Sequence, residues 1–300
     1  MSLRPPLRRR SACPLVAALI VAVPFASGGC GRSPTSPSPT GPPASNAPIR
    51  YTALGASDAN GVGSSVPCAP FAPCEDGTGY VPVLARQLRA SREVTVVNLG
   101  IPASVLSPAI EAIARQYGRD VTANFIDREL PFVPRDSTLV TIFGGANDAN
   151  AIGDAIASGA AGANVPGYIA AQARTFGADY DRLVRGVRSR APDAFMIVLN
   201  VPNLAALPYA ARYPLEQRRV LQAISVAFSL EANRQAGGGV TVMDMMCDAA
   251  AYDPLRFSPD GYHPNDAGYA YMAARLAAIV QGAASAVPES CAAMRVVPTL

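Results

Sequence analysis

The sequence predicts an α/β protein in which helices cover both faces of one open, parallel β-sheet. Five short runs of apolar and β-branched residues recur along its 300 residues. Most of these runs are apolar at nearly every position, as expected for strands buried on both faces. Longer segments with the apolar spacing of helices lie between the runs, and this alternation implies right-handed crossovers. With 50% hydrophobic residues the chain can form one large core, which excludes a disordered protein.

The predicted elements can be placed by residue number. The five strands are expected at residues 49–54, 94–99, 139–143, 195–201 and 240–243. Helices with one apolar face are expected at residues 80–90, 167–190, 214–236 and 266–281. Residues 149–167 are rich in Ala and Gly, so they predict either a mobile loop or a short helix. Ligands of such sheets bind at the carboxyl ends of the strands, where we expect residues 58–78 and 202–209 to shape the rim of a site.

Residues 1–30 have the pattern of an export signal. Four arginines precede an apolar run of thirteen residues at 14–26, which is too short for a membrane helix of about 20 residues. Small residues then lead to Cys30, as in a bacterial lipoprotein cleavage site, although Ser27 stands where Leu is usual. The chain is therefore expected either to carry a lipid on Cys30, which would tether it to a membrane of the cell envelope, or to be cleaved nearby and released.

Residues 31–48 are rich in Pro, Ser, Thr and Gly and predict an extended, semi-rigid linker. A single folded domain, which we expect to be monomeric, then occupies residues 49–300. All 25 basic residues of the chain are arginines, and without the four before the apolar run they are nearly balanced by 22 acidic residues. This near-neutral domain has no basic stripe, which excludes nucleic acid as a partner.

The cysteines indicate disulfides rather than a metal site. Cys13 and Cys30 belong to the leader, and an even number remains, which favours disulfides in an exported chain. Three pairings are possible, and we favour Cys68 with Cys74 and Cys247 with Cys291 over buried free thiols. The chain has no Cys-x-x-Cys pair and only one histidine, so a zinc site is not expected.

A calcium loop and other cofactors are not expected either. Asp148, Asn150 and Asp154 have part of the spacing of a calcium loop, but Ile152 supplies no oxygen and no closing Glu follows. We therefore predict that the chain uses no metal and no cofactor.

Three predicted strand ends carry residues that suggest chemistry. The first strand runs into Gly55-Ala56-Ser57-Asp58, where a tight turn can expose the serine hydroxyl at the start of a helix. The second is followed by Gly100, whose small size lets the backbone N–H approach a ligand. The third is followed by Asn147, whose amide can donate to an oxyanion. Each motif alone also occurs in ordinary turns.

The fourth motif, Asp260-Gly261-Tyr262-His263-Pro264, is the most informative, because His263 is the only histidine of the chain. Although a lone histidine is more often structural, Asp260 lies three residues before it and can hold one ring nitrogen. Any reaction that needs a serine and a histidine base depends on His263.

The order Ser, Gly, Asn and Asp-x-x-His resembles that of the SGNH hydrolase family, also called GDSL lipases and esterases, over most of residues 49–282. The resemblance implies a flavodoxin-like, three-layer α/β/α sandwich with a five-stranded parallel sheet. It also implies that Ser57 is a nucleophile in a triad with His263 and Asp260, and that the Ser57 N–H, Gly100 and Asn147 form the oxyanion hole. The sequence departs from the family at Ala56, because the first block usually reads Gly-Asp-Ser.

The expected function is therefore that of an exported serine hydrolase, which cleaves carboxylic esters through an acyl-enzyme intermediate. Its substrate would be a small-molecule, lipid or carbohydrate ester, and the absence of an extended apolar lid slightly favours short acyl chains. The alternative, suggested by Ala56, is a surface lipoprotein that keeps the fold as a non-catalytic binding module.

Overall fold

The computed structural model of the chain describes residues 41–300. The predicted export signal, Cys13, the proposed lipidation site Cys30 and the linker up to residue 40 lie outside these described residues. Within residues 41–300, none of the helices has both the length and the apolar character needed to span a membrane.

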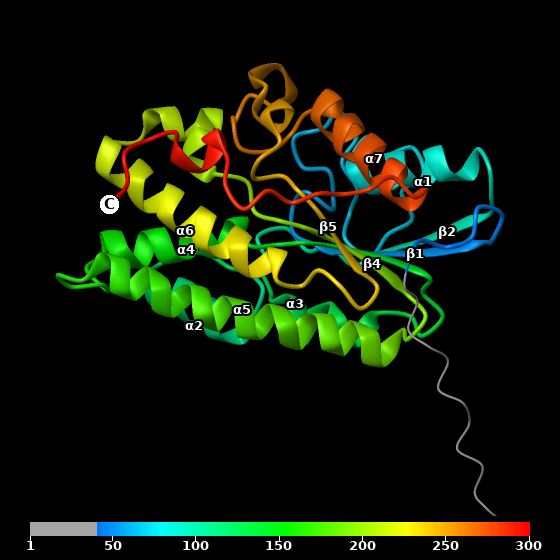
Figure 1. Cartoon of the computed structure of the whole chain (residues 1–300), viewed down its shortest axis with the longest axis horizontal. Helices are drawn as coiled ribbons and strands as arrows, with labels where there is room; N and C mark the ends of the chain where they lie inside the picture. The colour runs from blue at the N-terminus through cyan, green and yellow to red at the C-terminus, as the bar shows by residue number, and fades with distance from the viewer. Residues whose placement is uncertain (1–40) are drawn as a thin grey trace, which may run out of the picture. The chain divides into compact units, whose positions relative to one another are not determined.

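The sheet has five parallel strands, as predicted, and their order is β2-β1-β3-β4-β5 (Figure 1). The strands are β1 Ile49–Gly55, β2 Val94–Asn98, β3 Leu139–Phe143, β4 Phe195–Leu199 and β5 Val240–Met243. Each lies within two residues of its predicted bounds. Leu54 of β1 pairs with Ile142 of β3, and Ile142 pairs with Val198 of β4. This register places buried apolar side chains in rows across the sheet.

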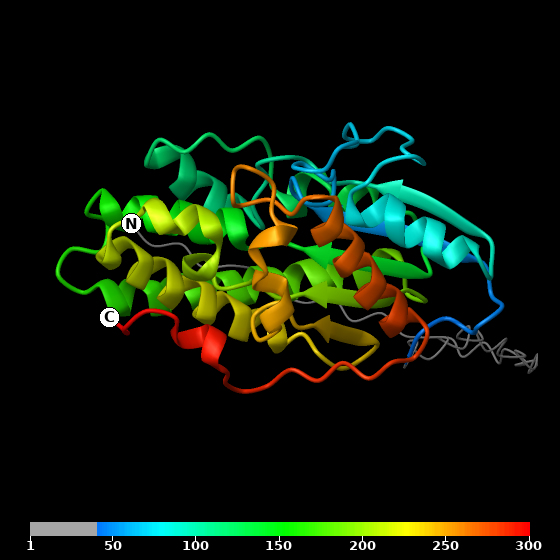
Figure 2. The same cartoon turned by 90° about the horizontal axis from the view of Figure 1, so that it is seen from above.

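Helices cover both faces of the sheet (Figures 1 and 2). One face carries α1 Tyr80–Arg89 and α7 Asp266–Val280, and the other carries α2 Pro108–Gln116, α3 Phe125–Arg128, α4 Ala146–Ala157, α5 Val165–Arg190 and α6 Leu215–Asn233. Met196 of β4 belongs to the core under the second group of helices, whereas its neighbour Ile197 belongs to the core under α1 and α7. Because both sides of β3 and β4 are buried along their whole length, their sequences are almost entirely apolar and do not alternate.

Short 3-10 helices complete the described chain at Leu130–Phe132, Leu204–Ala206, Pro208–Arg212, Ala249–Tyr252, Pro254–Arg256 and Ala292–Arg295. The short helices α2 and α3 were not predicted. Asn124 caps α3 by accepting a hydrogen bond from the Asp127 N–H at 2.8 Å.

Residues 149–167 do not form a mobile loop, so that alternative is wrong. Helix α4 covers Ala146–Ala157, and α5 begins at Val165 with Asn164 as its cap. Gly145 precedes α4 with φ 115°, and a Cβ there would lie 2.5 Å from a side-chain carbon of Val201. Glycine is therefore required at the turn that starts α4.

The structure contains both favoured disulfides, Cys68–Cys74 and Cys247–Cys291, which close loops of 6 and 44 residues. The second bond fixes the C-terminal segment against the domain, where Gln222 of α6 donates to the Val297 carbonyl oxygen at 2.8 Å.

Removing the longer disulfide is expected to destabilise the domain more than removing the shorter one. Replacing Cys247 and Cys291 with Ser should lower the free energy of unfolding by about 4 kcal/mol, because the unfolded chain regains the entropy of a long loop. The matched control, Cys68 and Cys74 to Ser, should cost about 2 kcal/mol by the same relation. Urea unfolding of the two variants measures both values, and an equal or reversed order would contradict the prediction.

Candidate active site

Ser57 lies just beyond the carboxyl end of β1 and is 7% exposed. Its carbonyl oxygen accepts a hydrogen bond from the Val62 N–H at 3.0 Å, within a series of turns over residues 57–63. No helix begins at Ser57, since the next helix, α1, starts at Tyr80. The structure therefore gives Ser57 a tight turn without the helix N-terminus that the sequence suggested.

The structure brings Ser57, His263 and Asp260 together. His263 Nε2 lies 2.9 Å from Ser57 Oγ, across a separation of 206 residues. The other ring nitrogen, Nδ1, lies 2.6 Å from Asp260 Oδ2. A hydroxyl, an imidazole and a carboxylate in this order can transfer the serine proton to the ring while the carboxylate orients it.

Asp260 is surrounded by hydrogen-bond donors. Its Oδ1 accepts from the N–H groups of Tyr262 and His263 at 2.8 and 2.9 Å and from the Ser258 hydroxyl at 2.8 Å. Partial burial alone would raise the pKa of Asp260, but the bonds from the His263 ring, the two N–H groups and Ser258 outweigh it. They hold the pKa of this carboxyl well below its usual range, so the group is an anion beside the ring.

The loop that carries Asp260 and His263 is fixed by its own backbone. The Ser258 N–H donates to the His263 carbonyl oxygen at 2.8 Å. Gly261 has φ 69°, and a Cβ there would lie 2.7 Å from the backbone nitrogen of Tyr209. Helix α7 then begins after Asn265, whose side chain accepts from the Gly268 N–H.

Asn147 lies in the first turn of α4, and its amide is held at both ends. Its Nδ2 donates to the Ser104 carbonyl oxygen at 2.9 Å, and its Oδ1 accepts from the Tyr262 hydroxyl at 3.4 Å. An amide nitrogen carries two hydrogens, so one remains for a ligand. Asn147 also lines a cavity of about 10 Å³ that adjoins Ala56 and Asp58.

Gly100 lies in the turn after β2, where a larger residue would not fit. A Cβ there would lie 2.6 Å from the Ala59 Cβ. The Gly100 N–H donates to Asn98 Oδ1 at 3.1 Å, so an oxyanion would have to displace that oxygen.

Ala103, which the sequence analysis did not single out, lies in the same turn. It has φ 62°, a conformation that an alanine adopts only at a cost of about 1–3 kcal/mol. Within the described residues its N–H donates to no acceptor, and the next residue, Ser104, supplies the carbonyl oxygen that holds Asn147. Backbone strain of this kind could be recognised only from the folded turn.

Asp58 follows Ser57 and lines two small cavities. One is the cavity beside Asn147, and the other, of about 50 Å³, is lined also by Pro202, Leu204 and Leu207, as expected for residues 202–209. Burial raises the pKa of Asp58, while the nearby His263 ring opposes this shift. Ser57 and His263 line neither cavity, but Asp58 places both next to the serine in the chain.

The sequence model of the GDSL-like Lipase/Acylhydrolase family matches residues 53–271, a range that includes Ser57, Gly100, Asn147, Asp260 and His263. The chain belongs to this family. It is therefore a carboxylic ester hydrolase, as the order of its motifs predicted. No curated protein sequence matches it.

Solved structures show the same fold as this GDSL-like hydrolase. An extracellular lipase from Streptomyces rimosus matches with a TM-score of 0.55 at 18% identity, over 77% of this chain and 99% of that one. A lipase from a goat rumen metagenome gives a TM-score of 0.53 at 17% identity, over 77% and 97%. An acetyl-xylooligosaccharide esterase from Geobacillus gives 0.51 at 15% identity, over 81% and 99%.

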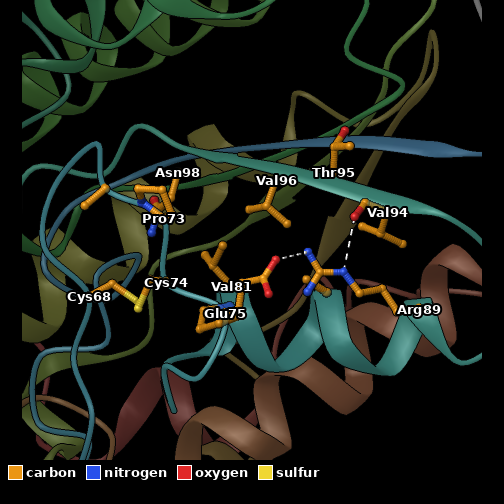
Figure 3. A pocket seen from close by; sticks show the side chains of 13 residues that line it. Cys68, Pro73, Cys74, Glu75, Val81, Arg89, Val94, Thr95, Val96 and Asn98 are labelled. Carbon is orange, nitrogen blue, oxygen red and sulfur yellow. Dashed lines mark hydrogen bonds and ion pairs between the residues drawn. A yellow bond between two sulfur atoms is a disulfide. The ribbon is translucent and has the colours of Figure 1, made fainter.

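A further cavity of this hydrolase, of about 280 Å³, lies between β2, α1 and the Cys68–Cys74 loop (Figure 3). Arg89 and Glu75 form an ion pair at 3.4 Å at its side. Neither Ser57 nor His263 lines it. Of residues 58–78, which were expected to shape the rim, Asp58 lines the two small cavities, whereas the disulfide loop shapes this separate cavity.

Among residues 41–300, no cluster of His, Cys, Asp or Glu has the arrangement of a metal site. Asp148, considered for a calcium loop, is fully buried at the start of α4 and accepts from the Leu106 N–H at 2.8 Å. Burial raises its pKa to about 7. Its role in the fold is to tie the turn after β2 to α4.

Proposed function

We propose that this chain is an exported serine esterase that cleaves short-chain carboxylic esters with Ser57, His263 and Asp260. The observation that carries the proposal is the continuous contact from Ser57 Oγ through the His263 ring to Asp260, at 2.9 and 2.6 Å. Asp58, the residue after Ser57, lines cavities of only about 10 and 50 Å³, and these small volumes support a preference for small acyl groups.

The reaction proceeds in two halves. Ser57 Oγ attacks the ester carbonyl carbon as its proton passes to His263 Nε2, and the ring then gives this proton to the departing alkoxide oxygen. The alcohol leaves, and the acyl group stays bonded to Ser57. Water then attacks the acyl carbon and gives a proton to the ring, which returns it to Ser57 Oγ as the carboxylic acid leaves. Asp260 stabilises the imidazolium of both halves.

The negative oxygen of the two tetrahedral intermediates needs hydrogen-bond donors. We assign the Ser57 N–H and the free hydrogen of the Asn147 amide to this role. Gly100 remains a proposed donor, whose N–H must leave Asn98 to serve, and the Ala103 N–H is a further donor of the same turn. Donors fixed before the reaction lower the barrier because they need no reorganisation.

Asn147→Ala is expected to lower kcat by about 10²–10³-fold, because one oxyanion donor is lost. The fold should persist, since Asn147 is a partly exposed residue of the first turn of α4. Ester turnover and thermal unfolding measure the two effects. Asn164→Ala is the matched control, since it removes an amide that caps α5 and should leave turnover unchanged. A loss below a few-fold for Asn147→Ala would exclude its role.

A fluorophosphonate probe tests the nucleophile directly. Labelling of the wild type but not of Ser57→Ala is expected. Labelling of neither would favour the alternative, a non-catalytic binding module. Initial rates across esters of increasing acyl length, with Ser57→Ala as the blank, then test the preference for short chains.

Export and domain organisation belong to the same proposal. We assign residues 1–30 to an export signal, residues 31–48 to a linker and residues 49–300 to the hydrolase domain. A lipid on Cys30 would tether the domain to a membrane, whereas cleavage without lipid would release it. Mass spectrometry of the mature N-terminus distinguishes the two, since an unmodified N-terminus beyond residue 30 excludes the lipoprotein.

A further inference from the structure

A buried glutamate lies beneath the turns that carry the site. Glu129 follows α3 and has an exposed fraction of 0%. Its Oε2 accepts a hydrogen bond from the Gly55 N–H at 2.9 Å, and its Oε1 lies 3.3 Å from the Ser104 hydroxyl. Within the described residues it has no ion pair.

These two contacts connect Glu129 to both halves of the site. Gly55 is two residues before Ser57, at the end of β1. Ser104 supplies the carbonyl oxygen that holds the Asn147 amide at 2.9 Å. Glu129 therefore lies between the turn of the nucleophile and the turn of the oxyanion donors. Ala56 leaves the nucleophile turn without the carboxylate that the family's first block usually provides there.

The hydrogen positions follow from the distances. The Ser104 hydroxyl has one hydrogen, and its nearest acceptor is the Ile101 carbonyl oxygen at 2.7 Å. A hydrogen on Glu129 Oε1 would then complete the contact with Ser104, while Oε2 stays the acceptor for Gly55. Burial raises the pKa of Glu129 well above its usual value, and the hydrogen bond from the Gly55 N–H only partly opposes this rise, which supports the neutral acid.

We propose that Glu129 is a positioning residue, which as a neutral carboxylic acid connects the Ser57 turn to the Ser104 turn and so aligns the nucleophile with the oxyanion donors. This inference rests on the proposed function of Ser57 and Asn147. Glu129 does not touch the reacting atoms, and its effect passes through the Gly55 N–H and the Ser104 hydroxyl.

The test compares Glu129→Gln with Glu129→Leu. Glutamine reproduces the neutral acid, because its Oε1 accepts from Gly55 and its Nε2 donates to Ser104. It should keep kcat within about 3-fold of the wild type, whereas leucine should lower kcat by about 30-fold or more with KM within about 3-fold, because misaligned groups slow the chemical step. Glu231→Gln is the control, because it alters a carboxylate of α6 that pairs with Arg234 and should change neither kcat nor KM.

Hydrogen exchange of the Gly55 amide gives a readout that does not need turnover. Exchange should be faster in the leucine variant than in the wild type and restored by glutamine. If the wild type cleaves no ester, the proposed function fails, while the exchange result still decides whether Glu129 joins the turns.

Should the leucine variant not fold, Ser104→Ala removes the other end of the connection and should lower kcat by about 3–10-fold with KM unchanged. A glutamine variant as slow as leucine, or a leucine or Ser104→Ala variant with wild-type kcat and exchange, would overturn the inference.

Discussion

His263→Ala is expected to lower kcat for ester hydrolysis by about 10⁶-fold, because the residues of the triad that we propose act as a unit. The ring is the only imidazole of the chain, so no other histidine can accept the Ser57 proton at 2.9 Å. The substitution removes contacts of the ring but leaves the backbone bond between Ser258 and residue 263 intact. The fold should therefore persist, as circular dichroism and thermal unfolding can verify.

The double variant Ser57→Ala, His263→Ala provides the control for this expectation. If the two residues act in one proton transfer, the double variant should be no slower than either single variant. If the double variant instead loses kcat by the product of the two single losses, the two residues act independently. A His263→Ala variant within about 100-fold of the wild type would contradict the assignment of the general base.

Asp260→Asn is expected to lower kcat by about 10⁴-fold while the loop keeps its shape. An asparagine can still accept from Ser258 and the backbone through its oxygen, but its nitrogen would face His263 Nδ1 and favour the wrong tautomer. Steady-state kinetics, with a crystal structure of the variant, measure the effect. Ser258→Ala removes only one of the bonds to Oδ1 and should cost far less. Equal losses for the two variants would indicate that Asp260 acts only by holding the loop.

The same carboxylate gives a stability effect with a defined sign. Because the folded protein holds the pKa of Asp260 below its usual value of about 4, its contribution to stability is present above that pH and is lost as the pH falls. Asp260→Asn should therefore flatten the decrease in melting temperature on acidification below about pH 4.

The sheet could be predicted from the sequence because its physical signal is local. Strands buried on both faces are apolar at nearly every position, as in Phe195–Leu199 and in Leu139–Phe143, where Thr141 is the one polar residue. The helices with one long apolar face were predicted for the same reason. The short helices α2 and α3 have too few turns to establish a period, and they are held by caps and tertiary packing.

The proximity of Ser57, Asp260 and His263 was predictable because the chain has only one histidine. A chain with one histidine leaves one choice for the base, and parallel strands bring their carboxyl ends to one edge. The contacts of Glu129 with Gly55 and of Gly100 with Asn98 were not predictable. The first joins residues 74 apart, and the second depends on how a turn directs an N–H. Neither of these two contacts is indicated by a motif or a periodic pattern in the sequence.

The direction of β1 has a practical consequence for how the domain is immobilised or fused. The chain enters this strand at Ile49 and reaches Ser57 only after passing its other end at Gly55, so about 20 Å of extended backbone separates the point of entry from Ser57. A bead, reporter or carrier joined upstream of Ile49 thus attaches at the amino-terminal edge of the sheet. The opposite edge, where Ser57 lies, stays accessible to solvent and substrate.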